Sequence, residues 1–289
     1  MIQTGLSPNV ERDDLWLAIK ILFLPWYWFR WKRGSAVRNL EKAFEHRLGV
    51  KHAIAFQRGR DGLLVLLQAL GVGKGDEVIL QAYTCVVVPN AIQFTGAKPV
   101  YADLEREGFN IDPESIEKRI NKRTRAVIVQ HTFGEPADLF SIRAICQKHH
   151  LFLIEDCAHA LSTSLHGRAL GTFGDAALWS FGRDKVISSV WGGMLTIKDE
   201  TLSELLREKQ QKLPFPGFFS IKQALLHPLL WAIIKPFYRF RLTRALVQLF
   251  QKCRLLPLVI FPSEKRGKKP SWMPERMANA MALLAVHQL

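Results

Sequence analysis

The pattern of apolar and polar positions changes character twice along the chain. Between residues 35 and 200, short β-rich apolar runs alternate with amphipathic stretches such as GLLVLLQALGVG (62–73) and LFSIRAICQKHH (139–150). This alternation predicts an α/β fold with three layers, α/β/α, around a mostly parallel sheet whose two faces are covered. The runs that predict strands are 52–56, 77–82, 98–103, 125–130, 151–155, 177–181 and 193–197.

Residues 1–34 form a separate N-terminal apolar and basic segment. Its run from Leu15 to Phe29 would reach about 22 Å as a helix, short of the roughly 30 Å hydrocarbon core of a bilayer. Pro25 interrupts the run, and Arg30 and further basic residues follow it. Two interpretations are open: a segment that lies on a membrane surface with its Trp and Tyr rings among the headgroups, or a helix packed on the core or on a partner subunit.

Residues 201–269 have a third character, with no acidic residue between Glu208 and Glu264. Long apolar runs too short to span a bilayer alternate there with basic residues, which favours an element that faces anionic lipid at a membrane surface. The alternative is a helical hairpin buried against the main domain. The basic residues of this interval are Lys209, Lys212, Lys222, Lys235, Arg239, Arg241, Arg244, Lys252 and Arg254.

The net charge of +14 favours anionic partners. Nucleic acid is an unfavoured partner, because nucleic-acid-binding segments seldom carry this many Leu, Ile and Phe residues. The four cysteines lie far apart in the sequence and form no CxxC pair, which argues against a disulfide framework and against a metal site. With no apparent signal peptide, the chain is expected in the reducing cytoplasm.

Candidate chemistry lies where three predicted strands end. The glycine-containing turn QRGRDG follows run 52–56, Asp156 and His159 follow run 151–155, and Lys185 follows run 177–181. Ligands of parallel α/β sheets bind outside the carboxyl ends of the strands. Pyridoxal phosphate requires a lysine, a carboxylate for its ring nitrogen and a cradle for its phosphate, such as a helix N-terminus. Taken singly, these features are better explained as a surface lysine, a capping aspartate, an interior histidine and a steric glycine.

In combination, the segments resemble the DegT/DnrJ/EryC1/StrS family of pyridoxal-phosphate-dependent sugar aminotransferases. The resemblance covers roughly residues 35–200, with a weaker echo at 270–289, and it implies the large domain of the fold-type-I transferase fold. Residues 201–269 resemble an insertion found in a membrane-associated branch of the family. The matching segments are GVGKGDEVILQAYT, NAIQFTGAKPVYADLE, HTFGEPADL, LIEDCAHA, GTFGDAALWSF and SFGRDK.

The resemblance implies a role for each candidate residue. Lys185 takes the place of the family's Schiff-base lysine, and Asp156 that of the carboxylate paired with the pyridinium nitrogen. His159 matches a position that contacts the cofactor ring or its phenolic oxygen, and Ser180 matches a serine that binds the phosphate. The turn whose backbone amides hold that phosphate corresponds to Gly59, Arg60 and Asp61.

The chain departs from the family pattern at two of these places. Cys85 follows Thr84 where the family has an aromatic residue that stacks on the cofactor ring, so His159 or Tyr83 is expected to cover that face if any residue does. Arg60 and Asp61 replace small residues in the phosphate turn. A carboxylate beside a phosphate is unfavourable unless it caps the helix or pairs with an arginine.

The resemblance implies an aminotransferase that moves an amino group, with glutamate as donor, to a nucleotide- or lipid-linked keto-sugar in cell-surface polysaccharide or glycan biosynthesis. A homodimer is expected, peripheral to the inner membrane surface. Residues 270–289 are expected to be the start of a truncated C-terminal small domain. The alternative is a non-catalytic membrane-associated scaffold or partner subunit that keeps the fold.

Overall fold

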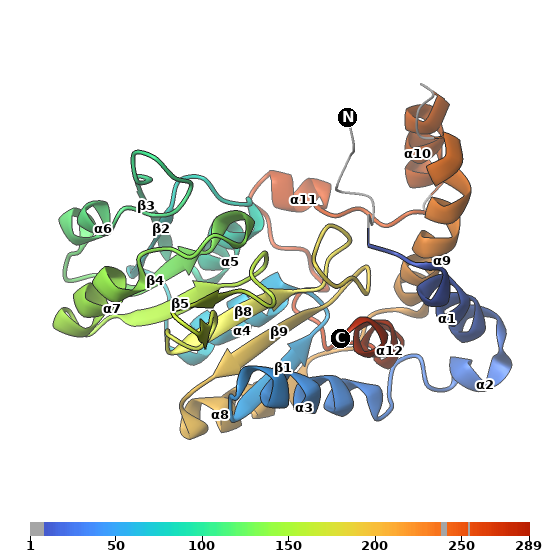
Figure 1. The fold of residues 1–289 in the computed structure, drawn as a ribbon, viewed down its shortest axis with the longest axis horizontal. Helices are drawn as coiled ribbons and strands as arrows, with labels where there is room; N and C mark the ends of the chain where they lie inside the picture. The colour runs from blue at the N-terminus through green and yellow to red at the C-terminus, as the bar shows by residue number, and fades with distance from the viewer. Residues whose placement is uncertain (1–8, 238–241, 254) are drawn as a thin grey trace.

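A seven-stranded sheet forms the centre of the computed structural model, which describes residues 9–237, 242–253 and 255–289 (Figure 1). Its order is β1-β9-β8-β5-β4-β2-β3, and β9 alone among these strands runs antiparallel to its neighbours. The seven strands predicted from the sequence are confirmed within one residue at either end. They are β1 (His52–Phe56), β2 (Glu77–Gln81), β3 (Lys98–Ala102), β4 (Thr124–Gln130), β5 (Phe152–Asp156), β8 (Ala176–Ser180) and β9 (Gly193–Ile197).

The sheet separates two hydrophobic cores, because successive side chains of a strand point to opposite faces. In β4, Val127 and Val129 enter one core, and Ala126 and Ile128 enter the other. Both faces of the strand are therefore apolar, which is why its sequence reads as a continuous apolar run. This arrangement confirms the three-layer α/β/α architecture.

Helices from distant parts of the sequence cover the two faces. Side chains of α3, α7 and α12 join the first core, together with part of α1, while those of α4, α5 and α8 join the second. A two-stranded hairpin, β6 (Ser164–Leu165) and β7 (Arg168–Ala169), lies outside the main sheet. The helices named here are α1 (Arg12–Phe23), α3 (Ala36–Leu48), α4 (Gly59–Ala69), α5 (Val87–Thr95), α7 (Leu139–Lys148), α8 (Glu200–Lys212) and α12 (Asn279–Gln288), and α6 (Pro113–Arg119) packs beside α7.

The N-terminal segment forms two helices with an elbow between them. Helix α1 ends at Phe23, and Leu24 is extended because the residue before a proline avoids the helical conformation. Pro25 then opens α2 (Pro25–Trp28) at the position where a helix tolerates proline. Helix α1 buries Ile21 and Leu22 and leaves other large side chains exposed, so the segment is packed on the core along one face only.

The basic apolar region after α8 forms a helical extension at one end of the molecule (Figure 1). Helix α9 (Phe218–Ile234) packs against α1, and α10 (Leu242–Lys252) packs against α9. Within the described ranges, no helix is long and apolar enough to cross a bilayer. Of the basic residues in this region, Arg239, Arg241 and Arg254 and the side chain of Arg244 lie outside the described part of the chain.

The chain then returns from α10 toward the sheet. It passes through α11 (Pro262–Lys265), and Arg276 forms an isolated β-bridge with Phe56, the last residue of β1. Figure 1 shows α11 between the α/β core and the α9–α10 end of the molecule. The return brings residues 255–276 to the end of β1, which is the start of the glycine-containing turn before α4.

Candidate active site

The carboxyl ends of β5 and β8 bring Asp156 and Ser180 to the same edge of the sheet. The two strands are parallel neighbours, and Asp156 pairs in register with Leu178. The loop after Ser180 carries Lys185, whose side chain is only 14% exposed and whose Nζ lies 3.5 Å from the Asp184 carboxylate. The lysine is therefore a largely buried side chain at the sheet edge, and the surface-lysine interpretation is wrong.

Asp156 is buried, and burial raises the pKa of its carboxyl above the ordinary value. Its Oδ1 accepts one hydrogen bond from the backbone N–H of Ala158 at 3.1 Å. The hydrogen bond from Ala158 and the positive charge of Lys185 partly oppose the effect of burial on this pKa. A buried carboxylate with so few donors has capacity for a further cationic or N–H partner.

His159 lies on the same side of the sheet edge. Burial, together with the charge of Lys185, lowers the pKa of its imidazole, so the ring is neutral at neutral pH. Its Nδ1 accepts the backbone N–H of Phe133 at 3.4 Å, and its ring stacks on Phe133 with 6.0 Å between centroids. Phe133 has a left-handed φ of 57°, an uncommon conformation for a bulky residue. The stacked pair places a flat aromatic surface beside Asp156 and Lys185.

The N-terminus of α4 reaches the same region. An added Cβ on Gly59 would lie 3.1 Å from the carbonyl oxygen of Trp179 and 3.7 Å from the Cβ of Ser180, so α4 begins directly against the end of β8. Gly193 makes a still closer approach, since its added Cβ would lie 2.3 Å from the backbone nitrogen of Gly59. The side chain of the N-cap residue Arg58 makes no capping hydrogen bond to α4. The first N–H groups of the helix are therefore available to an anion.

Asp61 pairs with an arginine, one of the two arrangements that the sequence allowed. Its Oδ2 lies 3.4 Å from Nη1 of Arg58, and its side chain is fully buried. Burial raises the pKa of this carboxyl to about 6 despite the fields of Arg58 and Arg60. Arg58 is itself held by Glu275 at 2.8 Å and stacks over the rings of Trp191 and Trp272.

Cys85 is exposed at the start of α5, and the hydroxyl of the preceding Thr84 donates to Oε1 of Gln130 at 2.7 Å. Tyr83 is half exposed and turns toward Phe109, with 5.8 Å between ring centroids. His159, by contrast, is stacked and close enough to Asp156 and Lys185 to interact with both electrostatically. Of the two aromatic rings that the sequence offered for the cofactor face, the geometry favours His159.

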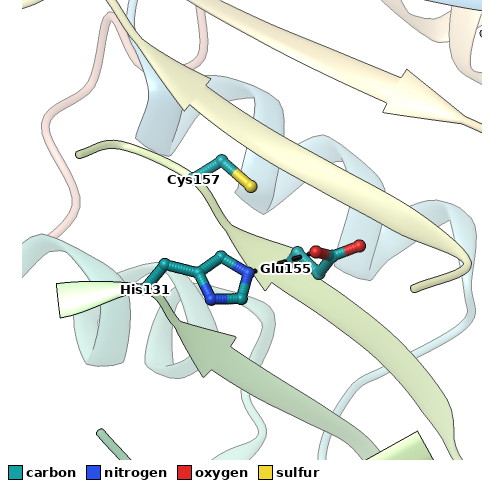
Figure 2. Close-up of side chains that lie close together, drawn as sticks. All are labelled: His131, Glu155 and Cys157. Carbon is teal, nitrogen blue, oxygen red and sulfur yellow. Dashed lines mark hydrogen bonds and ion pairs between the residues drawn. The ribbon is translucent and has the colours of Figure 1, made fainter. Parts of the chain in front are cut away.

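Figure 2 shows a second cluster, His131, Glu155 and Cys157, around the ends of β4 and β5. Glu155 is fully buried and accepts the backbone N–H groups of Gly171, Phe173 and Gly174 at 2.6–2.8 Å. Nε2 of His131 lies 3.1 Å from Glu155 Oε2, while Nδ1 accepts the N–H of Ala137 at 3.2 Å. These contacts assign the proton to Nε2, which donates to Glu155.

This arrangement is a hydrogen-bonded anchor and fits a metal ion poorly. Both ring nitrogens of His131 and both oxygens of Glu155 already have partners. Burial, with the charges of Glu155 and Asp156, raises the pKa of the Cys157 thiol well above its ordinary value, so the thiolate that a metal prefers does not form. The anchor fixes the residue directly before Asp156, and the backbone N–H of His131 donates to the Asp156 carbonyl at 3.2 Å.

Comparison with known proteins extends the resemblance seen in the sequence. The sequence profile of the DegT/DnrJ/EryC1/StrS aminotransferase family matches residues 27–218. The chain belongs to this family. It is 40% identical over 180 residues to GDP-perosamine synthase from Vibrio cholerae, covering 62% of this chain and 49% of that protein. It is 41% identical over 200 residues to the spore coat polysaccharide biosynthesis protein SpsC from Bacillus subtilis, covering 69% and 50%.

Solved structures show the same architecture for this DegT/DnrJ/EryC1/StrS family member. An aminotransferase from Psychrobacter cryohalolentis is 26% identical with a TM-score of 0.71, and the match covers 98% of this chain and 62% of that one. The aminotransferase TlmJ from Streptoalloteichus hindustanus is 32% identical with a TM-score of 0.66, covering 72% and 56%. The fold is that of the fold-type-I transferases. The chain spans about half the length of the curated relatives that it matches.

Several site contacts of this family member were not anticipated from its sequence. Nδ2 of Asn9 donates to the carbonyl of Lys185 at 2.6 Å, and Nη1 of Arg183 donates to the carbonyl of Pro257 at 3.3 Å. Glu264 pairs with Arg60, with 3.0 Å between Oε1 and Nε. The sequence did contain one indication of the last contact. Glu264 is the first acidic residue after Glu208, and a single acid in a basic region is a candidate partner for a buried basic residue.

The anchor at Glu155 predicts a pH-dependent loss of stability when the residue is changed to glutamine. Burial would raise the pKa of this carboxylate, but the hydrogen bonds from His131, Gly174 and Gly171 outweigh it and hold the pKa below the ordinary 4.5. A glutamine would turn an N–H group toward backbone N–H donors, at a cost of about 2–4 kcal/mol in the free energy of unfolding.

Because the folded pKa of Glu155 is lowered, its contribution is present above the unfolded pKa and is lost as the pH falls through the folded value. The difference between wild type and Glu155→Gln, measured by urea unfolding, should therefore be full at pH 6–8 and shrink below about pH 4.5. Glu114→Gln, a change of an exposed carboxylate, serves as control. A difference that stays constant down to pH 3 would contradict the assignment of a charged, hydrogen-bonded Glu155.

Proposed function

We propose that this chain is a pyridoxal-phosphate-dependent sugar aminotransferase. It moves an amino group from a donor, with glutamate proposed, to a nucleotide- or lipid-linked keto-sugar in cell-surface polysaccharide or glycan biosynthesis. The observation that carries the proposal is the convergence of Lys185, Asp156 and the uncapped N-terminus of α4 at one edge of the sheet. The names of the relatives, GDP-perosamine synthase and SpsC, support the sugar and the polysaccharide context.

The residues present fit the cofactor. A buried carboxylate, Asp156, has room for an N–H cation, which a protonated pyridine nitrogen would supply. The N–H groups that open α4 at Gly59, beside Ser180, suit a phosphate. Lys185 is close enough to interact with Asp156 and His159, and His159 offers the flat face of a neutral ring. When bound, pyridoxal phosphate supplies a ring that accepts the electrons released at the α-carbon of the amino donor.

With the cofactor bound, Asp156 would hold the proton of the ring nitrogen through the negative charge of its carboxylate. Lys185 Nζ would remove the proton from the α-carbon of the donor and hold it for the return transfer. The carboxylate of Asp184 lies 3.5 Å from Nζ and forms an ion pair with the lysine. The Glu155 anchor holds the strand end that carries Asp156, which limits the movement of its carboxylate during the reaction.

Two observations favour the second candidate, a membrane-associated scaffold that keeps the fold without turnover. Arg60 in the phosphate turn is already paired with Glu264, and Cys85 stands where the family stacks an aromatic ring. The scaffold would bind pyridoxal phosphate weakly, if at all, and would show no half-reaction with any amino acid. The two candidates therefore differ in the half-reaction measured with the donor alone.

Asp156→Asn tests the catalytic proposal. The amide removes the negative charge that maintains the ring proton, so the donor half-reaction should slow by about 10² or more while the protein stays folded. The measurement is the change in visible absorbance when glutamate is added to protein loaded with pyridoxal phosphate. Asp138→Asn is the matched control, because Asp138 is an exposed N-cap of α7 and asparagine caps a helix equally well. Equal half-reaction rates in the wild type and both variants would contradict the role of Asp156.

We also propose a homodimer whose second copy covers the exposed aromatic cluster at the site. Tyr83, Phe109 and Phe133 contact one another at 5.5–6.5 Å between ring centroids, and all three are at least half exposed. An apolar cluster of this kind beside a site is typical of a surface that a partner buries. The chain is predicted to sediment as a dimer and Phe109→Asp as a monomer, with Phe140→Asp, a change of an exposed ring on α7, as control. A monomeric wild type would contradict this.

The membrane contact is proposed for the face formed by α1 and α2, which we call the aromatic elbow. Trp26 and Phe29 project from it, and Phe29 is 89% exposed. Basic side chains flank these rings, with Lys20, Arg30 and Arg33 exposed, whereas the acids of α1 lie at its opposite end. The combination of exposed tryptophans with adjacent positive charge matches the headgroup region of an anionic bilayer. The exposed large apolar side chains here are Trp16, Phe23, Trp26, Trp28 and Phe29.

Flotation with vesicles tests this contact. The protein should bind vesicles that contain phosphatidylglycerol and should bind pure phosphatidylcholine vesicles weakly, with binding reduced at high salt. Trp26→Ala/Phe29→Ala should weaken binding by at least about tenfold, since two large rings lose their apolar contact. Phe140→Ala removes another exposed ring, far from the elbow in the sequence, and should bind as wild type does. Equal loss in both variants, or no binding by wild type, would contradict the proposal that the enzyme works at the cytoplasmic face of the inner membrane.

A further inference from the structure

The start of α4 contains more buried positive charge than its structural contacts account for. Arg58, Arg60 and Arg183 are each at most 7% exposed and lie around the ends of β1 and β8. Burying a guanidinium is costly unless its N–H groups find partners. Arg58 and Arg60, which lie next to Gly59, can therefore be compared by the contacts that the structure gives their guanidinium groups.

Arg58 is held mainly by the protein itself, although its Nε has no hydrogen-bond partner within the described ranges. Its Nη1 contacts Asp61 at 3.4 Å and Glu275 at 2.8 Å. Its guanidinium carbon also lies 4.6 Å from the ring centroid of Trp191 and 4.3 Å from that of Trp272. Two carboxylates and two aromatic faces account for the burial of this side chain, and its role is structural.

Arg60 is only half satisfied. Nε lies 3.0 Å from Glu264 Oε1, and Nη1 donates to the carbonyl of Val259 at 3.1 Å. Nη2 is buried and has no hydrogen-bond partner within the described ranges. Burial and the charge of Arg58 lower the pKa of this guanidinium, so its environment as it stands disfavours the cation. An anion in addition to Glu264 would give Nη2 a hydrogen-bond acceptor and stabilise the cation.

Arg60 lies on the side of α4 where that anion would arrive. It is the second residue of the helix, after Gly59, and its guanidinium is close enough to the Cys85 thiol to interact with it electrostatically. The Cys85 loop follows β2, and Ser180 lies against Gly59 at the end of β8. The uncapped N–H groups of α4 and the unpartnered Nη2 of Arg60 therefore belong to the same strand-end region.

The segment that returns from α10 fixes Arg60 in this position. Glu264 is fully buried on α11, and its Oε2 accepts the N–H of Phe261 at 2.9 Å, so its carboxylate cannot swing freely. The carbonyl of Glu264 also accepts Nδ2 of Asn90 on α5 at 2.8 Å. Residues 257–264 thus form a strap over the start of α4. The strap contacts Nε and Nη1 of Arg60 and makes no hydrogen bond with Nη2.

We infer that Arg60 is a side-chain ligand of the cofactor phosphate, oriented by Glu264 of the strap, with Nη2 donating to a phosphate oxygen beside the N–H groups of α4. The inference rests on the proposed function, since it names how this chain holds the phosphate of pyridoxal phosphate. Arg60 thereby supplies the positive charge that balances Asp61, and the strap becomes part of the cofactor site.

The experiment compares pyridoxal phosphate with pyridoxal, which lacks the phosphate, as ligands of the full chain. Binding is followed by the quenching of tryptophan fluorescence, so that no turnover is needed. Arg60→Met/Glu264→Gln removes the ion pair as a unit and avoids leaving a buried carboxylate alone. Arg58→Met/Glu275→Gln is the matched control, since it removes a neighbouring buried ion pair. Circular dichroism and a thermal melt establish that both double variants are folded.

The preference of the wild type for pyridoxal phosphate over pyridoxal should fall by at least about tenfold in Arg60→Met/Glu264→Gln, the loss expected for one charge-assisted contact. The control should keep the wild-type preference. Arg60→Lys, which keeps the charge and the contact to Glu264 but has no Nη2, should lose an intermediate amount and gives the answer if a double variant fails to fold.

An unchanged preference in Arg60→Met/Glu264→Gln and in Arg60→Lys would overturn the inference and leave the proposed function standing. An equal loss in the Arg58 control would also overturn it, because the effect would then follow from any disturbance of the turn. A wild-type protein that binds neither pyridoxal phosphate nor pyridoxal would overturn the proposed function, and the inference with it.

Discussion

A carboxylate buried at the end of a parallel strand must be compensated, and the surroundings of Asp156 depend on this requirement. Its pKa is raised by burial, and one backbone N–H of the described chain donates to it, while Lys185 supplies positive charge from nearby. Fixing such a group costs free energy that a purely structural aspartate would not justify. The Glu155 anchor directly before it, with three backbone donors and His131, holds the strand end rigidly enough to keep that carboxylate in place.

Buried positive charge at the start of α4 must be compensated in the same way. There the chain buries arginines instead of an acid, and it compensates them with Glu264 and Glu275 from a segment about two hundred residues further along the sequence. The region that begins as a basic, apolar extension beyond α8 therefore returns to complete the sheet edge. The residues that precede α1 reach the same loop, since Asn9 donates to the Lys185 carbonyl. The two regions that distinguish this chain from a simple α/β unit both contact the candidate site.

Much of this could be predicted from the sequence, because the signals were local. Apolar runs of five or so residues defined the strands, and the rule that parallel strands present their carboxyl ends at one edge brought Asp156, Ser180 and Lys185 together. The pairing of Asp61 with an arginine was one of the foreseen alternatives. What could not be predicted was long-range: no spacing in the sequence connects Glu264 to Arg60 or Asn9 to Lys185. The aromatic cluster of Phe109 and Phe133 was missed for the same reason.

The most direct test of the account is the site at which the cofactor attaches. The protein is mixed with pyridoxal phosphate, reduced with borohydride, digested with trypsin and analysed by mass spectrometry, with Lys185→Ala treated in parallel. The account predicts one dominant phosphopyridoxyl label on the peptide that contains Lys185, and its loss in the variant. The central claim is that Lys185, whose side chain is largely buried, is the catalytic amine. Label spread over exposed lysines such as Lys118, with none on Lys185, would contradict it.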